Sequence, residues 1–225
     1  VPENEFVMLE LARRVGIDVP ETRLVPVAEI GGLPPVATPG RVALAVRRFD
    51  RTGDGGRIHT EDFAQVFDVF PSDKYRTASC ENIAAVLWAE AAQSDIAEFA
   101  RRLAFNALIG NGDLHLKNWS LIYRDGRTPR LAPAYDFVST VAYVADDRMA
   151  LSLGGTKRWT DVSVDLFRRF AAKAGVPEGL VLDAARETAD RFREAWAKHE
   201  AAARLPEALR TRVSEHLRAV PLSGE

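Results

Sequence analysis

The residues best suited to chemistry lie in the stretch NGDLHLKNWS, residues 111–120, directly after a long apolar segment. Asp113 and Asn118 are separated by five positions, with His115 and Lys117 between them. An aspartate at the start of such a loop can accept the proton of an attacking hydroxyl, and an asparagine five residues later can bind a metal ion. The spacing therefore indicates phosphoryl transfer.

A second carboxylate follows where this chemistry needs one. Mg²⁺ prefers hard oxygen ligands, and a kinase supplies one from an aspartate that follows a short hairpin after the catalytic loop. The segment 119–132 predicts such a hairpin, because two short strand patterns flank the turn sequence RDGRTPR. The sequence APAYDFVST then places Asp136 before Phe137. The order of loop, hairpin and carboxylate is that of a protein-kinase catalytic core.

Each of these residues has a simpler explanation when taken alone. Asp and Asn near a helix end are commonly caps or turn formers, and a single histidine is more often structural than catalytic. A metallophosphoesterase could use Asp113 and His115 as metal ligands. That class needs later clusters of Asp, Asn and His, however, and His199 and His216 are the only histidines after residue 118. Both lie in amphipathic helical patterns, which disfavours this alternative.

The surrounding sequence predicts an α+β protein that is mostly helical. The helical patterns cover residues 6–16, 59–67, 79–92, 94–110, 161–175, 177–203 and 206–220. Ser79 and Ser94 are candidate N-caps. Residues 21–30 and 41–50 predict two paired strands joined by a Gly/Pro-rich loop. A turn-rich joint near residues 50–58 divides the chain into a short α+β part and a larger helical part.

Composition is that of an ordinary globular protein. The chain has 225 residues, 47% hydrophobic and 28% charged, with a formal net charge of −2, so no global charge points to nucleic acid or an anionic membrane. Cys80 is the single cysteine and excludes an intramolecular disulfide. The sequence contains no apolar stretch of 18 residues and no signal-peptide pattern at VPENEF. These features predict a cytoplasmic protein.

Six motifs occur in an order that resembles a known family. They are NEFVMLELARRVGIDVPE, LAVRRFDR, HTEDFAQVF, the pair Lys74–Tyr75, GNGDLHLKNWSLI and LAPAYDFVS. Together they resemble the HipA-like family, the serine/threonine kinase toxins of bacterial toxin–antitoxin modules, over residues 3 to about 143. The resemblance implies a bilobal, protein-kinase-like fold with a truncated N-terminal lobe. Residues 1–50 would be the remnant of that lobe, with a hinge near residues 45–50, and residues 51–225 would form the helical C-terminal lobe.

The resemblance also implies roles for individual residues. Asp113 looks like the catalytic base of a loop at residues 111–118, and Asn118 and Asp136 look like the Mg²⁺ ligands, the latter in a metal-binding segment at residues 135–136. The residues expected at the nucleotide are Arg47, Arg48, Phe49, His115, Leu116, Lys117, Asn118, Tyr135 and Asp136. Arg47 and Phe49 would contact the adenine edge through main-chain groups. Glu5 fits either the glutamate that pairs with a nucleotide lysine or an ordinary acidic residue in a first helical turn.

Two features of such kinases are not found in this sequence. A Gly/Ser-rich phosphate loop and a strand lysine should precede the first helical pattern. Lys74 and Lys157 lie in turn-like sequences and are poor replacements for that lysine. Because the chain begins at Val1 rather than Met, we expect it to start partway through a longer reading frame. A reduced relative of the family is the alternative.

The function implied by the resemblance is ATP- and Mg²⁺-dependent phosphorylation of a protein serine or threonine by a toxin. It further implies a DNA-binding, HipB-like antitoxin partner and an aminoacyl-tRNA synthetase as the type of substrate, without a membrane partner. Autophosphorylation and direct contact with DNA stay open. One alternative is a small-molecule phosphotransferase, although its loop usually carries His directly before the Asp, where this chain has Gly112. The other is an inactive kinase-like module that binds an antitoxin, which has no chemical need for Asp113, Asn118 and Asp136.

Overall fold

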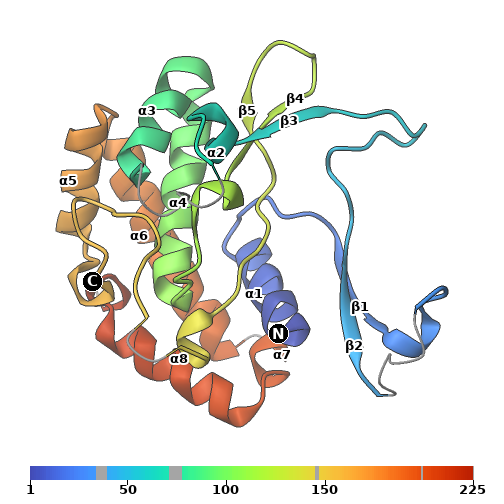
Figure 1. Cartoon of the computed structure of the whole chain (residues 1–225). Helices are drawn as coiled ribbons and strands as arrows, with labels where there is room; N and C mark the ends of the chain where they lie inside the picture. Colours follow the sequence, from blue (N-terminus) through green and yellow to red (C-terminus); the bar gives the residue numbers. More distant parts are fainter. Residues whose placement is uncertain (34–39, 71–77, 145–146, 199, 225) are drawn as a thin grey trace.

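The computed structural model describes residues 1–33, 40–70, 78–144, 147–198 and 200–224. Its helices are α1 (Pro2–Arg14), α2 (Phe63–Val66), α3 (Cys80–Glu90), α4 (Gln93–Ile109), α5 (Val164–Ala174), α6 (Glu178–Lys198), α7 (Glu200–Ala203) and α8 (Glu207–Ala219). Its strands are β1 (Thr22–Pro26), β2 (Val42–Val46), β3 (His59–Asp62), β4 (Ser120–Tyr123) and β5 (Arg130–Leu131). The mostly helical α+β class is confirmed (Figure 1).

Helix α4 lies at the centre of the helical body and packs against α3, α6 and α8 (Figure 1). It is buried on more than one face: Phe99 packs edge-on against Trp119 with ring centroids 4.6 Å apart, and Phe105 packs against Phe192 on α6. A helix that is apolar around most of its circumference must be covered on all sides. Helix α4 therefore gives the segment that follows it a rigid base.

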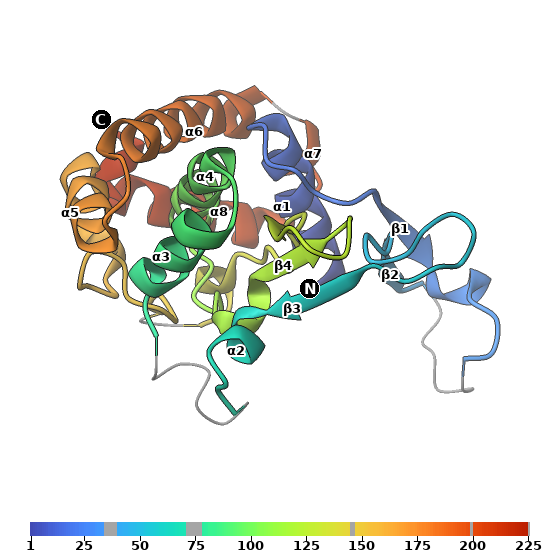
Figure 2. The same cartoon turned by 90° about the horizontal axis from the view of Figure 1, so that it is seen from above.

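Helix α1 is part of the same core. Val7, Met8 and Leu11 are completely buried and belong to the cluster that includes the apolar side chains of α4 and α6. Helix α1 also contacts β1 and β2, which pair antiparallel and extend away from the helical body (Figure 2). The division of the chain into two lobes at residue 50 stays a prediction. The buried residues of α1, which precede that point, belong to the same core as α4 and α6.

The second sheet differs from the sequence-based expectation. Strands β3, β4 and β5 form an antiparallel sheet in that order, with Asp62 opposite Ser120. Residues 59–67 were expected to be helical, which is wrong for the first four, because the edge of β4 provides hydrogen-bond partners that outweigh a weak helical pattern. Only α2 follows, and a reciprocal capping box between Asp62 and Gln65 starts it. The hairpin expected at residues 119–132 is present as β4 and β5.

The two N-cap predictions have different outcomes. Ser79 caps α3, and its backbone N–H donates to the Asn82 side chain at 2.9 Å. Ser94 is not an N-cap, because α4 begins one residue earlier and the Ala92 N–H donates to the Asp95 carboxylate at 3.2 Å. Lys74, Tyr75 and His199 lie outside the described residues. In the described part of the chain, no helix combines the length and apolar character that a membrane span requires.

Candidate active site

The predicted catalytic loop leaves α4 through a left-handed turn. Gly110 has φ 65°, and the next N–H, that of Asn111, donates to the Asn106 carbonyl at 3.0 Å. A Cβ at Gly110 would lie 2.6 Å from both γ carbons of Val141. Glycine is required here both for the backbone conformation and for the close approach. The turn directs residues 111–118 back across the end of the helix.

Buried residues anchor the loop, while its aspartate faces solvent. The Asn118 side-chain oxygen accepts a hydrogen bond from the His115 N–H at 2.9 Å, which closes the 3₁₀ turn Leu116–Asn118. His115, Leu116 and Asn118 are buried, whereas the Asp113 side chain is 58% exposed. The Nε2 atom of His115 lies 4.0 Å from an Asp113 carboxylate oxygen. The loop can therefore present one carboxylate to an incoming hydroxyl without moving its buried anchors.

The two predicted metal ligands lie side by side. The Asn118 side-chain amide donates a hydrogen bond to the Asp136 carboxylate. Asp136 has φ 60°, a left-handed conformation that is rare outside glycine. Asn111 lies between the two segments: its amide donates to the Asp136 carbonyl at 3.2 Å, and its side-chain oxygen accepts from the Asp113 N–H at 3.3 Å. Sequence reasoning missed this role of Asn111, because one asparagine beside a glycine usually signals only a turn.

Tyr135 connects the predicted metal-ligand segment to the loop and to the segment after β2. Its hydroxyl donates to the Lys117 carbonyl at 2.9 Å and lies 2.6 Å from the Ser120 hydroxyl. Its ring stacks on Phe49, with centroids 5.8 Å apart and an interplanar angle of 28°. Burial raises the pKa of Tyr135 to about 12, and the charges of nearby aspartates act in the same direction. The phenol therefore stays protonated at neutral pH and keeps its donor.

Arg47 and Arg48 do not join the cluster through their side chains. The Arg47 guanidinium lies 3.5 Å from Glu21 with both side chains 76% exposed, and Arg48 pairs with Asp50. The Arg47 N–H donates to the Glu21 carbonyl at 2.9 Å, which extends the β1–β2 ladder by one bond. Phe49 is therefore the member of this predicted segment whose side chain contacts a residue of the predicted site, Tyr135.

Glu5 lies in the electrostatic field of Asp136. Burial, and next the negative charge of Asp136, raise the pKa of Glu5 to about 7. Partial burial and a second carboxylate nearby both disfavour the charged form of a carboxyl group. Perturbed pKa values of this kind are common at functional sites. The end of α1 that carries Glu5 thus adjoins the predicted metal-ligand segment, although the two are far apart in the chain.

The donor set fits one Mg²⁺ ion bound together with a nucleotide. The Asn118 side chain presents its NH2 group to Asp136 while its oxygen accepts from the His115 N–H, so one cation could touch an oxygen of each only after the Asn118 amide rotates. Mg²⁺ usually takes one or two protein ligands, with phosphates and water completing its shell. Within the described ranges, no group of three or more His, Cys, Asp and Glu side chains could hold a metal by itself.

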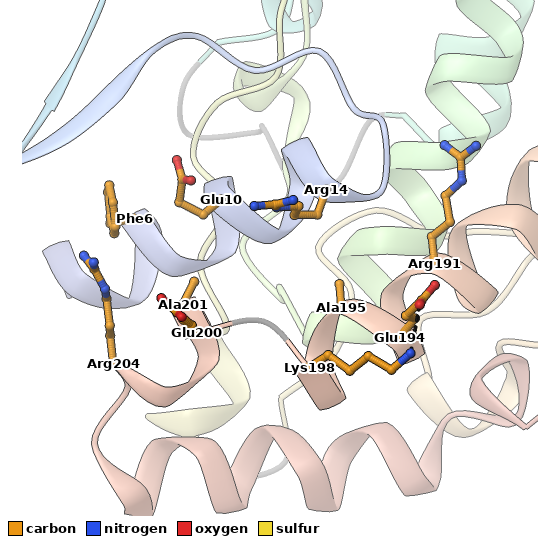
Figure 3. Close-up of a pocket in the computed structure, with 10 residues that line it drawn as sticks. All are labelled: Phe6, Glu10, Arg14, Arg191, Glu194, Ala195, Lys198, Glu200, Ala201 and Arg204. Carbon is orange, nitrogen blue, oxygen red and sulfur yellow. Dashed lines mark hydrogen bonds and ion pairs between the residues drawn. The ribbon is translucent and has the colours of Figure 1, made fainter.

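A cavity beside α1 lies away from these residues. It has a volume of about 830 Å³ and is lined by residues of α1, α6 and α7 and by Arg204 (Figure 3). Arg204 lies over the Phe6 ring, and Lys198 pairs with Glu194 at 3.0 Å. Both positive and negative side chains line this cavity, and none of the predicted catalytic or nucleotide residues lines it.

The fold and the site together define the class of protein: a kinase-like domain in which loop, hairpin and carboxylate follow a central helix. Residues 1–196 match the family described as the HipA-like C-terminal domain. The chain belongs to this family.

The curated relatives carry names that agree with this class. The chain is 52% identical over 198 residues to a Sinorhizobium fredii protein named "Putative kinase Y4dM". The matched region covers 87% of this chain and 48% of that protein. A second protein of that organism, "Putative kinase Y4mE", is 34% identical over 80% of this chain and 42% of its own length. The chain thus spans about half the length of the curated relatives it matches.

Two solved structures share the fold. A chain in the complex of HipA, HipB and operator DNA from Shewanella oneidensis superposes with a TM-score of 0.76 at 24% identity, over 98% of this chain and 54% of that one. The proinflammatory kinase CtkA of Helicobacter pylori superposes with a TM-score of 0.57 at 12% identity, over 97% of this chain and 82% of that one. At these identities the likeness concerns the fold.

Proposed function

We propose that the protein containing this chain is an ATP- and Mg²⁺-dependent serine/threonine protein kinase and the toxin of a toxin–antitoxin pair. The observation that carries this proposal is the contact between Asn118 and Asp136 beside an exposed Asp113. Asp113 accepts the proton of the substrate hydroxyl as that oxygen attacks the γ-phosphorus of ATP; the bond from this phosphorus to the β–γ bridging oxygen breaks, and ADP leaves with its electron pair. Asn118 and Asp136 would hold Mg²⁺, which would supply positive charge to the phosphate oxygens.

The nucleotide lies between the catalytic loop and the segment after β2. Phe49 and Tyr135, already stacked, offer an aromatic wall to the base. Because the Arg47 N–H is used by Glu21, the Arg47 carbonyl and the Phe49 N–H are the main-chain groups assigned to the adenine edge. Lys117 is exposed on the loop and faces the phosphates together with His115, Leu116 and Asn118. These assignments follow the order of the family motifs.

The partner proposals rest on the relatives. The Shewanella neighbour is found in a complex with HipB and operator DNA, so we assign a DNA-binding antitoxin of that type as the partner of this protein. A protein substrate that takes part in translation, such as an aminoacyl-tRNA synthetase, is the proposed target. The partner and the substrate are both proposed for the whole protein, because the chain spans about half the length of its relatives.

Phosphate transfer from γ-labelled ATP tests the proposal. The product of the complete reading frame is compared with Asp113→Asn and with Asp183→Asn, an identical change at an exposed position of α6. We expect label on the protein or on a target in a lysate, a loss of about 10²- to 10⁴-fold in Asp113→Asn, and no loss in Asp183→Asn. Equal activity of the wild type and Asp113→Asn would overturn the assigned base.

The other outcomes point to the alternatives. Nucleotide binding without transfer in the wild type would indicate a kinase-like module that binds a partner. Transfer to small hydroxyl compounds, and not to protein, would indicate a small-molecule phosphotransferase. Both results contradict the proposal of a protein kinase.

A further inference from the structure

A buried asparagine on α1 binds the backbone of the segment that follows Asp136. The Asn4 side chain is 2% exposed. Its amide donates to the Ser139 carbonyl at 3.1 Å, and its oxygen accepts from the Ser139 N–H at 3.1 Å, across 135 positions of sequence. The same amide donates to the Tyr143 hydroxyl at 3.2 Å. A side-chain amide that satisfies both main-chain groups of one residue fixes the position and the orientation of the backbone at that residue.

The contact depends on the backbone of residue 139 and not on its side chain. Among the described residues, the Ser139 hydroxyl is buried without a hydrogen-bond partner. The three hydrogen bonds of Asn4 therefore connect this segment to α1 without the Ser139 side chain. Such an arrangement is costly to break, because each unpaired buried polar group costs about 1–3 kcal/mol.

The next residue, Thr140, binds the first part of the catalytic loop. Its hydroxyl accepts from the Gly112 N–H at 2.6 Å and lies 3.1 Å from the Gly110 carbonyl. The Thr140 N–H donates to the same Gly110 carbonyl at 3.0 Å. Asp113 directly follows Gly112, so the position of Thr140 sets the peptide from which the proposed base extends.

Asn4 is thus connected to Thr140 through its hydrogen bonds to Ser139 and the peptide bond that follows Ser139. Asn4 holds Ser139, and Ser139 is covalently linked to Thr140, which holds Gly110 and Gly112. Helix α1 is immobilised in the core by Val7, Met8 and Leu11. A displacement of residues 139 and 140 would move the backbone that precedes Asp113. The buried anchor of the loop at Asn118 follows Asp113 in the chain.

We propose that Asn4 is a positioning residue of the catalytic loop, acting through the Ser139 backbone and the Thr140 hydroxyl to hold the peptide before Asp113. The inference rests on the proposed kinase function for its chemical meaning. The physical part of it, a connection from α1 to Gly112, can be measured without activity. Asn4 does not touch the substrate or the nucleotide in this scheme.

Amide hydrogen exchange of the 225-residue chain tests the connection directly. In Asn4→Ala we expect peptides covering residues 110–113 and 139–143 to exchange about tenfold faster or more, because loss of 1.4 kcal/mol of local stability is a tenfold change. Peptides of α5 and α6 report any global loss of stability. The control is Thr188→Val on α6, a position far from the loop in sequence. This change removes a buried hydrogen bond, 2.6 Å long, from the Thr188 hydroxyl to the Ala184 carbonyl.

The outcomes separate positioning from ordinary stabilisation. Faster exchange at 110–113 in Asn4→Ala, beyond the change in α5 and α6, supports the proposal if Thr188→Val lacks it. An equal change in all regions, or an unchanged loop, overturns it. If Asn4→Ala does not fold, Tyr143→Phe removes one of the three hydrogen bonds, and it should raise exchange at residues 139–143 and 110–113 by a smaller factor. No change in that variant also counts against the proposal.

A double-mutant cycle measures the catalytic consequence in the product of the complete reading frame. We expect Asn4→Ala and Thr140→Val each to lower kcat about tenfold or more, with the double variant no worse than the more severe single variant. Thr188→Val should retain kcat within about twofold. Additive losses would show that the two residues act separately and would overturn the proposed connection from Asn4 through Thr140 to Gly112. Absence of transfer in the wild type would instead sink the proposed function, and the exchange result would still decide whether Asn4 holds the loop.

Discussion

The side-chain amide of Asn118 donates a hydrogen bond to the carboxylate of Asp136, eighteen positions further along the chain. The hairpin of β4 and β5 makes this contact possible, because its antiparallel register pairs Leu121 with Leu131 and returns the chain to its starting point. Two oxygen-bearing side chains from separate segments are thereby held at one place. The first three of the following predictions concern residues that build or support this arrangement.

Substitution of Asp136 should separate its chemical role from its backbone conformation. Asp136→Gly and Asp136→Ala both remove the carboxylate, so both should abolish Mg²⁺-dependent phosphate transfer. At φ 60° the alanine variant keeps the left-handed strain that glycine relieves. We expect the glycine variant to be more stable by about 1 kcal/mol in urea unfolding. Equal stability of the two variants would contradict the strained conformation.

Tyr135→Phe should lower stability and nucleotide affinity together. The change removes the hydroxyl that contacts the Lys117 carbonyl and Ser120, and keeps the ring against Phe49. We expect a loss of about 1–2 kcal/mol in unfolding free energy and a several-fold weaker affinity for ATP.

The matched control for this change is Tyr123→Phe, which removes a 2.7 Å hydrogen bond to Glu61 within the β3–β4 pair. It should lower stability by a similar amount and leave ATP affinity unchanged, as measured by calorimetric titration. A fall in affinity in both variants would mean that general destabilisation, and not Tyr135, is responsible.

Gly110→Ala should be more damaging than the same change at another left-handed glycine. Gly110 has φ 65° and its new methyl would meet Val141 at 2.6 Å, whereas Gly126 has φ 76° and no atom within 4 Å of an added Cβ. Both variants lose about 1 kcal/mol to backbone strain. The first should lose about 1–3 kcal/mol more, because a packed neighbour has to move. Chemical denaturation of both variants measures the difference, and equal losses would contradict the close packing of Val141.

The stability of the chain should fall on acidification partly through His216. Burial lowers the pKa of His216, although its contact with the Ala107 carbonyl and the charge of Asp147 act in the opposite direction. The unfolded chain therefore binds a proton near pH 6.5 while the folded chain stays neutral to lower pH. This contribution to stability is complete above the unfolded pKa and is lost as pH falls through and below it.

His216→Gln removes this titration and keeps a side-chain donor near the Ala107 carbonyl. Urea midpoints at about pH 7.5 and about pH 5.5 give the comparison, and the drop between them should be smaller in the variant. An identical drop in wild type and variant would show that His216 does not contribute.

The local order of chemical groups could be predicted from the sequence. Asp113, Asn118 and Asp136 were found by spacing, because a loop and a short hairpin connect them and such connections have few geometries. The hairpin at residues 119–132 and the capping of α3 by Ser79 followed from turn and cap chemistry, which acts over a few residues. Whether these three side chains perform the proposed reaction stays a prediction for the experiments above.

The tertiary structure alone decided which distant segments support the loop. Residues 59–62 became a strand because β4 offered an edge, and no local pattern encodes the presence of a neighbour. The contact between Asn4 and Ser139 spans 135 positions and uses one polar side chain, so it leaves no periodic signal. The sequence by itself thus determined the residues for chemistry and their order, since these are properties of short segments. Their positions relative to α1 depend on how the core packs, which only the folded chain specifies.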